Sequence, residues 1–135
     1  MLKIRIYSFG YKKSGIPKDE TINGGGFVFD CRFIYNPGRI QEFVNLTGKD
    51  KEVINFLDNH VEMQDFLQRS FGIVTAALEN FKERNFTDLM VSFGCTGGQH
   101  RSIYAAEKLK EYLKSTFNGN LLIELKHTEF PQLTS

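Results

Sequence analysis

The chain has 135 residues, of which 41% are hydrophobic and 24% are charged; this size and composition are typical of one soluble globular domain with its own core. The formal net charge of +1 excludes a strong overall attraction to nucleic acid or anionic membranes, and no apolar run is long enough for a transmembrane helix or a signal peptide. The two cysteines have neither disulfide-framework nor zinc spacing, which favours the reducing cytoplasm. We expect a single domain over residues 1–135, with no metal ion and no cofactor.

The first part of the chain predicts two strands joined by a long loop. Residues 2–9 alternate apolar and polar positions, which is typical of a strand with one buried face. Residues 27–35, FVFDCRFIY, are rich in aromatic and β-branched side chains and predict a second, more buried strand that ends at a turn over 36–38. The connection over 10–26 is polar and rich in glycine and lysine, and loops of this length are often functional or mobile.

Three segments predict helices. Thr47 and Asp50 form a Thr-x-x-Asp start signal ahead of an apolar pattern. Residues 63–82 have apolar side chains at helical spacing along one side, which predicts a helix that packs on the core. The pattern over 103–113 predicts a last helix of three to four turns.

Two more strands are expected at residues 88–93 and 120–127, where apolar runs are short and bounded by polar residues. Strands that alternate with helices predict an α/β sandwich with a mainly parallel sheet of four to five strands flanked by helices. No repeat, low-complexity tract or linker divides the chain.

The segment GCTGGQHRS, residues 94–102, lies between a predicted strand and a predicted helix, at the sheet edge where open α/β folds bind ligands. Its glycines allow a close backbone approach, the helix N-terminus offers unpaired amides, and Arg101 supplies a planar charged fork. Thr96 and Ser102 add hydroxyl donors. These features predict an anion site, most simply for phosphate; the alternative is a tight turn in which Arg101 pairs with a carboxylate. The segment matches neither the Walker A nor the dinucleotide-binding pattern.

Cys95 and Arg101 are separated by five residues and followed by Ser102, which is the spacing of the protein tyrosine phosphatase loop. There a thiolate attacks phosphorus and the arginine clamps the phosphate oxygens, and helix N-terminal amides lower the pKa of such a cysteine. Gly94 stands where those phosphatases have histidine. We therefore expect Cys95 to line an anion pocket and keep a catalytic Cys95–Arg101 pair as the alternative.

Asp30 and Arg32 are two residues apart in the second predicted strand and should share a face. One interpretation is a mutual or cross-strand ion pair; the other places both beside the glycine-rich segment, where Asp30 accepts from a sugar hydroxyl or amine and Arg32 contacts phosphate. His100, at the expected helix start, is a candidate ligand contact. His60 and His127 are isolated and are expected to be structural or exposed to solvent.

Four segments resemble the C-terminal domain of the RapZ/YvcJ family of bacterial nucleotide-binding regulators. They are SFGYKKSGIP (8–17), FVFDCRFIYNPG (27–38), LTGKDKEVINFL (46–57) and GCTGGQHRSIYAAEKL (94–109). The resemblance implies an α/β domain related to a phosphofructokinase subdomain, a pocket for a phosphorylated amino sugar such as glucosamine-6-phosphate, and small-RNA and protein partners. The family's pocket residues match this chain at Asp30, Arg32, Cys95, Thr96, Gly97, Gly98, His100, Arg101 and Ser102.

The chain also departs from this family. Gly38 stands where the family often has a pocket histidine, Gln99 where it often has lysine, and HTEFPQLTS (127–135) replaces a basic tail. We therefore expect a regulatory domain that binds a phosphorylated sugar or a nucleotide phosphate without catalysis, with a homo-oligomer or a separate protein as partner and with no RNA or membrane bound by the isolated chain. The alternatives are a phosphatase that uses Cys95 and Arg101, and an RNA- or protein-interaction module.

Overall fold

The computed structural model describes residues 1–134 and shows a parallel sheet of four strands in the order β2-β3-β1-β4. The strands are β1 (Lys3–Gly10), β2 (Phe27–Asp30), β3 (Asp88–Cys95) and β4 (Leu122–His127). The helices are α1 (Lys51–Asp58), α2 (Val61–Glu83) and α3 (Arg101–Phe117), with 3-10 turns at Pro37–Arg39, Gln41–Phe43 and Pro131–Leu133. The expected α/β fold with a parallel sheet is confirmed, and none of these helices is both long and apolar enough to cross a membrane.

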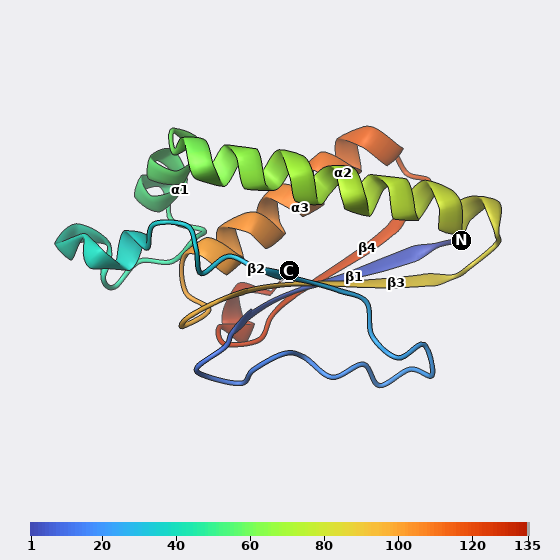
Figure 1. Ribbon diagram of the computed structural model, residues 1–135, viewed down its shortest axis with the longest axis horizontal. Helices are drawn as coiled ribbons and strands as arrows, with labels where there is room; N and C mark the ends of the chain where they lie inside the picture. The colour runs from blue at the N-terminus through green and yellow to red at the C-terminus, as the bar shows by residue number, and fades with distance from the viewer. Residues whose placement is uncertain (135) are drawn as a thin grey trace.

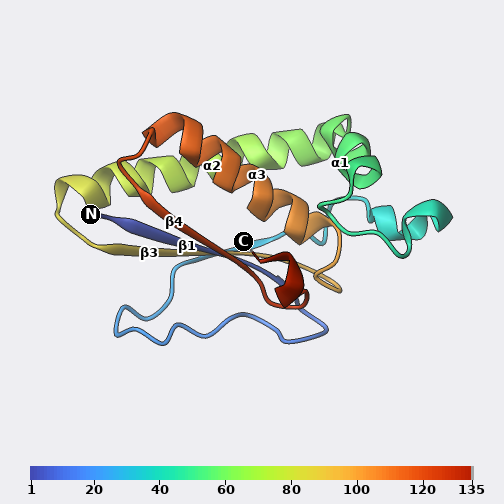
Figure 2. The ribbon, with the colours of Figure 1, turned by 180° about the vertical axis from the view of Figure 1, so that it is seen from behind.

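The helices cover one face of the sheet, and residues 11–26, here called the strap, run across the other face (Figure 1). The connections β2–β3 and β3–β4 cross the sheet in one direction and pass over the helical face. The connection β1–β2 crosses in the opposite direction. Because parallel crossovers are right-handed in about 98% of cases, this connection must use the opposite face. Figure 2 shows the same two layers from behind.

The core lies between the sheet and the helices. Alternate strand residues such as Ile4, Ile6, Val91 and Phe93 point into it and are fully buried. β1 was expected to have one buried face, but the strap also covers its second face, so Arg5 is only 9% exposed. The central strands are therefore buried on both sides, as is usual in parallel sheets.

An ion cluster fastens the strap to the sheet. Arg5 Nη2 lies 3.0 Å from Asp19 Oδ1 of the strap and 2.7 Å from Asp88 Oδ1 of β3. The hydrogen bond to Asp88 is the largest cause that raises the pKa of Arg5. Asp19 also accepts from the backbone N–H groups of Thr21 and Gly25, and these contacts lower its pKa to about 2, with the Thr21 amide as the largest cause.

Two predicted boundaries were wrong. The strand expected over 27–35 stops at Asp30, because the Asp30 carboxylate accepts from the Arg32 backbone N–H at 2.9 Å and turns the chain. β2 is also a half-buried edge strand rather than a more buried one. The Thr47–Asp50 start signal is present as a 2.7 Å bond from Thr47 N–H to Asp50 Oδ2, but α1 begins after Asp50, not after Thr47.

The remaining predicted elements were confirmed with small shifts. α2 contains the whole of 63–82, β3 extends two residues beyond the predicted 88–93, and β4 starts two residues after 120. α3 begins at Arg101 and ends at Phe117, so it is longer than predicted.

Candidate functional site

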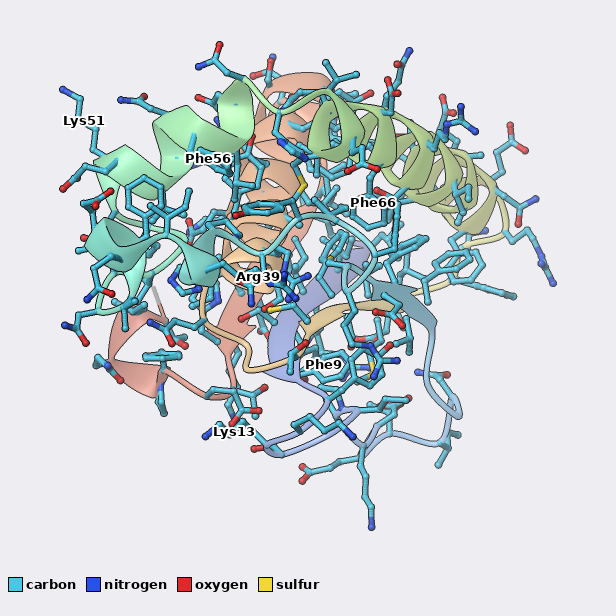
Figure 3. The ribbon with its side chains drawn as sticks, turned by 60° about the vertical axis from the view of Figure 1, so that its left-hand side comes forward. Phe9, Lys13, Arg39, Lys51, Phe56 and Phe66 are labelled. Carbon is cyan, nitrogen blue, oxygen red and sulfur yellow. The ribbon has the colours of Figure 1, made fainter. Side chains whose placement is uncertain are left out.

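The glycine loop, residues 94–102, leaves the carboxyl end of β3 beside the end of β1, where Gly10 is the register partner of Cys95. The connection after β1 passes to one face of the sheet and the connection after β3 to the other. This is the topological switch point at which open α/β sheets bind ligands. A Cβ on Gly10 would lie 2.7 Å from the backbone carbon of Gly97, so the two backbones touch. Figure 3 looks toward this end of the molecule, with Phe9 and Lys13 labelled.

The loop presents several unpaired backbone donors. No hydrogen bond within residues 1–134 uses the backbone N–H of Gly97, Gly98, Gln99 or His100. No side chain caps the start of α3 at Arg101. A Cβ on Gly97 would meet nothing within 4 Å, so the loop is open at this point. Unpaired amides at the positive end of a helix dipole attract anions.

The Arg101 side chain is anchored on one edge and free on the other. Its Nη1 donates to three backbone carbonyls, those of Cys31 (3.4 Å), Arg32 (3.0 Å) and Ile34 (2.7 Å). Nη2 has one long contact, 3.5 Å to Thr96 Oγ1, and Nε is buried without a partner in the described chain. Nε and Nη2 form one edge of the planar guanidinium, which is suited to a bidentate oxyanion. Arg101 is 3% exposed, so this edge is rigidly held.

Cys95 and Ser102 form a buried pair in which Sγ and Oγ are 3.2 Å apart. The Cys95 side chain belongs to the helix-facing core and is 2% exposed. Cys31 is also buried, which raises the pKa of its thiol, and both cysteines are free thiols. Cys95 thus lies behind the glycines of the loop and faces the helical layer, and its role as a pocket-lining residue stays a prediction.

His100 and Gln99 attach the loop to the segment before α1. His100 donates from Nε2 to the Phe43 carbonyl at 2.8 Å, and burial lowers the pKa of the ring. Gln99 Nε2 donates to the carbonyls of Val44 and Leu46, both at 2.8 Å. A Cβ on Gly38 would lie 3.1–3.3 Å from the far side of the His100 ring. His100 and Gln99 therefore hold the loop in place.

Asp30 and Arg32 form a mutual ion pair at the same edge of the sheet. Arg32 Nη2 lies 2.7 Å from Asp30 Oδ2, and the guanidinium lies 3.7 Å from the centroid of the Tyr11 ring. The bond from Arg32 is the largest cause that lowers the pKa of Asp30, and the charge of Arg101 adds to it. The expectation that both residues share a strand face was wrong, because Arg32 lies beyond the end of β2. The two side chains remain more than two fifths exposed.

Two charged side chains at this end of the molecule, Glu129 and Arg39 (Figure 3), were not singled out from the sequence. Glu129 accepts from Gly10 N–H, Ser14 N–H and Ser14 Oγ at 2.9–3.0 Å, and its Cγ lies 2.6 Å from the Cβ position of Gly98. Arg39, labelled in Figure 3, is exposed and has no side-chain ion pair within residues 1–134. The only available signal for Glu129 was its position just after the last predicted strand, since carboxyl ends of parallel strands share an edge.

Across residues 1–134, no group of three or more His, Cys, Asp or Glu side chains could hold a metal ion.

A family model described as the RapZ C-terminal domain matches residues 2–131. Proteins named nucleotide-binding protein are similar to the chain in Pseudothermotoga lettingae (40% identity over 114 residues, 84% of this chain and 39% of the relative) and in Thermotoga petrophila (37% over 130 residues, 96% and 43%). One from Histophilus somni is 38% identical over 114 residues, which are 84% of this chain and 38% of the relative. The chain thus spans about two fifths of the length of these relatives. By this match over nearly its whole length, the chain belongs to the RapZ C-terminal domain family.

Proposed function

We propose that this domain binds a phosphorylated small molecule at the glycine loop, without turnover, and serves a regulatory role in the cytoplasm. The phosphate sits on the amides of residues 97–100 and the start of α3. Family membership and the relatives named nucleotide-binding protein support a phosphate-bearing ligand. The resemblance of the pocket residues to the RapZ/YvcJ family supports an amino-sugar phosphate such as glucosamine-6-phosphate.

The observation that carries the proposal is the unpaired edge of Arg101. A buried guanidinium N–H without an acceptor costs free energy, and a bound oxyanion removes that cost. Three carbonyls orient the other nitrogen of the same group. The fork is therefore held in one orientation before the ligand arrives, and preorganised donors bind anions more tightly than flexible ones.

Asp30 and Arg32 provide polar groups for the rest of the ligand. Both side chains are partly exposed, and Asp30 lies near enough to Arg101 for its pKa to be lowered by that charge. An ammonium group on the ligand would compete with Arg32 for the Asp30 carboxylate. This arrangement favours an amino sugar over its hydroxyl analogue.

A thermal-shift and calorimetric series tests the proposal. The ligands are inorganic phosphate, glucosamine-6-phosphate, glucose-6-phosphate, glucosamine, AMP and ATP. We expect the phosphorylated compounds to stabilise the protein and glucosamine to have no effect. Arg101→Lys should keep the charge but bind at least about tenfold more weakly, because a lysine cannot form the bidentate fork.

Arg69→Lys, on the exposed side of α2, is the matched control and should bind like the unmodified protein. Absence of stabilisation by every phosphorylated compound would sink the proposal. So would equal affinities for Arg101→Lys and the control. Stabilisation by ATP and AMP but not by either sugar phosphate would retain the phosphate site and reject the amino sugar.

One observation favours a second candidate, a phosphatase that uses Cys95 and Arg101. The Ser102 hydroxyl, 3.2 Å from Cys95 Sγ, could stabilise a thiolate. The thiol is nearly inaccessible, however, and lies in the helix-facing wall. Hydrolysis of p-nitrophenyl phosphate that Cys95→Ser abolishes would establish this activity, and the absence of hydrolysis from pH 5 to 8 would reject it.

A further inference from the structure

A cavity of about 460 Å³ lies between the strap and the open face of the sheet. Its strap side is formed by residues 16–19 and 24–26, and its sheet side by Val28, Met90 and Ser92. The strap crosses this face in Figure 1, on the side opposite to the helices. The volume falls in the range of small-molecule sites, which is about 300–1,000 Å³.

Ser92 is an unpaired polar group in this cavity. It is 1% exposed, and its hydroxyl has no hydrogen-bond partner within residues 1–134. In the sheet register it lies between Tyr7 of β1 and Val28 of β2. Buried hydroxyl groups are almost always hydrogen-bonded, so an orphan that borders a cavity indicates a missing partner.

Among the residues that line the cavity, one cationic side chain has no ion-pair partner within the described chain. The Asp19 carboxylate is occupied by Arg5, Thr21 and Gly25. Lys18 lies at the rim, is exposed and has no ion pair within the described chain. Lys18 is the one cationic side chain among the residues that line the cavity, and it can pair with a single carboxylate at the rim.

The walls between Ser92 and Lys18 are apolar. Ile16 and Val28 are 54% and 40% exposed, which is high for aliphatic side chains that face a cavity. Pro17 and Met90 complete this surface. A ligand body that covers these side chains gains free energy from burial of apolar area.

We propose that this cavity is a second ligand site, for a small monocarboxylate with an apolar body and a hydroxyl or carbonyl oxygen at the end opposite the carboxylate. The carboxylate pairs with Lys18 at the rim, the apolar body lies between strap and sheet, and the distal oxygen hydrogen-bonds to Ser92. This site is separate from the glycine loop and does not depend on the phosphate proposal.

Amide NMR titrations with three matched probes test the proposal on the whole chain. The probes are 4-hydroxybenzoate, benzoate, which lacks the distal oxygen, and 4-hydroxybenzamide, which lacks the charge. We expect 4-hydroxybenzoate to shift the amides of residues 24–26 and Ser92 in a saturable way. Each of the other probes should bind about fivefold more weakly, the effect of one lost hydrogen bond or exposed ion pair.

Two variants assign these preferences to residues. Ser92→Ala should abolish the preference for 4-hydroxybenzoate over benzoate, and Lys18→Gln should abolish the preference for 4-hydroxybenzoate over the benzamide. Preferences that persist in these variants overturn the proposal, as does the absence of saturable shifts. Shifts confined to residues 94–102 also overturn it, because the carboxylate would then occupy the glycine loop. Phosphate binding by Ser92→Ala, measured in parallel, shows independently whether the glycine loop is functional.

Discussion

The connections that follow the adjacent strands β1 and β3 differ in whether their backbone amides have hydrogen-bond acceptors within the protein. At the end of β1 and in the strap, the protein's own carboxylates accept from the backbone amides: Asp19 accepts from Thr21 and Gly25, and Glu129 accepts from Gly10 and Ser14. In the glycine loop, the amides of residues 97–100 have no acceptor within residues 1–134. The two backbones nevertheless touch at Gly10 and Gly97.

This difference separates a structural use of backbone amides in the strap from the binding use that we propose for the glycine loop. A buried N–H must find an acceptor, and the strap finds its acceptors within the protein: its own Asp19, and Glu129 from the segment after β4. The glycine loop is short, leads directly into α3 and contains no acidic residue, so it supplies no carboxylate acceptor of its own. Four substitutions can break or sharpen this contrast.

Arg101→Ala should have the largest effect on stability. It removes the donor shared by three carbonyls of residues 31–34, and we expect the free energy of unfolding to fall by about 3 kcal/mol. Urea unfolding measures the change. Arg69→Ala, which removes an exposed arginine from α2, should stay within about 0.5 kcal/mol. Equal values for the two variants would show that Arg101 does not organise the loop.

Gly10→Ala and Gly97→Ala probe the contact between the two connections from its two sides. A Cβ on Gly10 would lie 2.7 Å from Gly97 backbone, whereas a Cβ on Gly97 meets nothing within 4 Å. We expect Gly10→Ala to lower the free energy of unfolding by about 2 kcal/mol and Gly97→Ala to change it by less than about 0.5 kcal/mol. The added methyl group of Gly97→Ala should instead weaken phosphate binding, since it occupies the open side of the loop. Comparable destabilisation by both variants would contradict the geometry.

Asp19 should make attachment of the strap sensitive to acid. Its pKa is lowered to about 2 by the amide of Thr21 and by its other bonds, so its contribution is complete above the ordinary aspartate range near pH 4 and is lost as the pH falls toward 2. The protection factors of strap amides in hydrogen exchange, corrected for the intrinsic rate at each pH, should fall over this window in the unmodified protein. Asp19→Asn should show faster exchange already at pH 5 and little further change. A strap that exchanges equally in both proteins at pH 5 would argue against this role of Asp19.

The sequence could predict the parts of this molecule that depend on local patterns. The strands, the helices and the glycine loop follow from apolar periodicity and from glycine spacing, and apart from the end of β2 and the ends of some helices they lie close to their predicted positions. The end of β2 could not be predicted, because FVFDCRFIY keeps a strand-like composition through Tyr35 and only the bond from Arg32 N–H to Asp30 marks the turn.

The hydrogen-bond partners of Arg101 and Glu129 could not be predicted from the sequence, for a different reason. Arg101 meets carbonyls some 70 positions earlier in the chain, and Glu129 meets Gly10 across 119 positions. Such contacts depend on the order of the strands, and backbone carbonyls leave no trace in a sequence. The sequence therefore singled out Arg101 without showing what holds its side chain in place, and its role in anion binding stays a prediction.

Two buried serines, one with a hydrogen-bonded hydroxyl and one with an unpaired hydroxyl, give the comparison with the smallest expected effect on stability. Ser8 and Ser92 are both 1% exposed and lie on neighbouring strands. The Ser8 hydroxyl is 2.6 Å from His127 Nδ1, whereas the Ser92 hydroxyl has no partner in the described chain. Ser8→Ala should lower the free energy of unfolding by about 1–2 kcal/mol, because it leaves a buried ring nitrogen unpaired.

Ser92→Ala should leave the free energy of unfolding unchanged or raise it by up to about 1 kcal/mol, because an unpaired hydroxyl leaves the interior. Urea unfolding of the two variants without added ligand gives the comparison directly. A loss of more than about 1 kcal/mol for Ser92→Ala would mean that its hydroxyl is already hydrogen-bonded in the free protein. The proposed site beneath the strap would then lose its unpaired hydroxyl, and the contrast between the two connections would rest on the glycine loop alone.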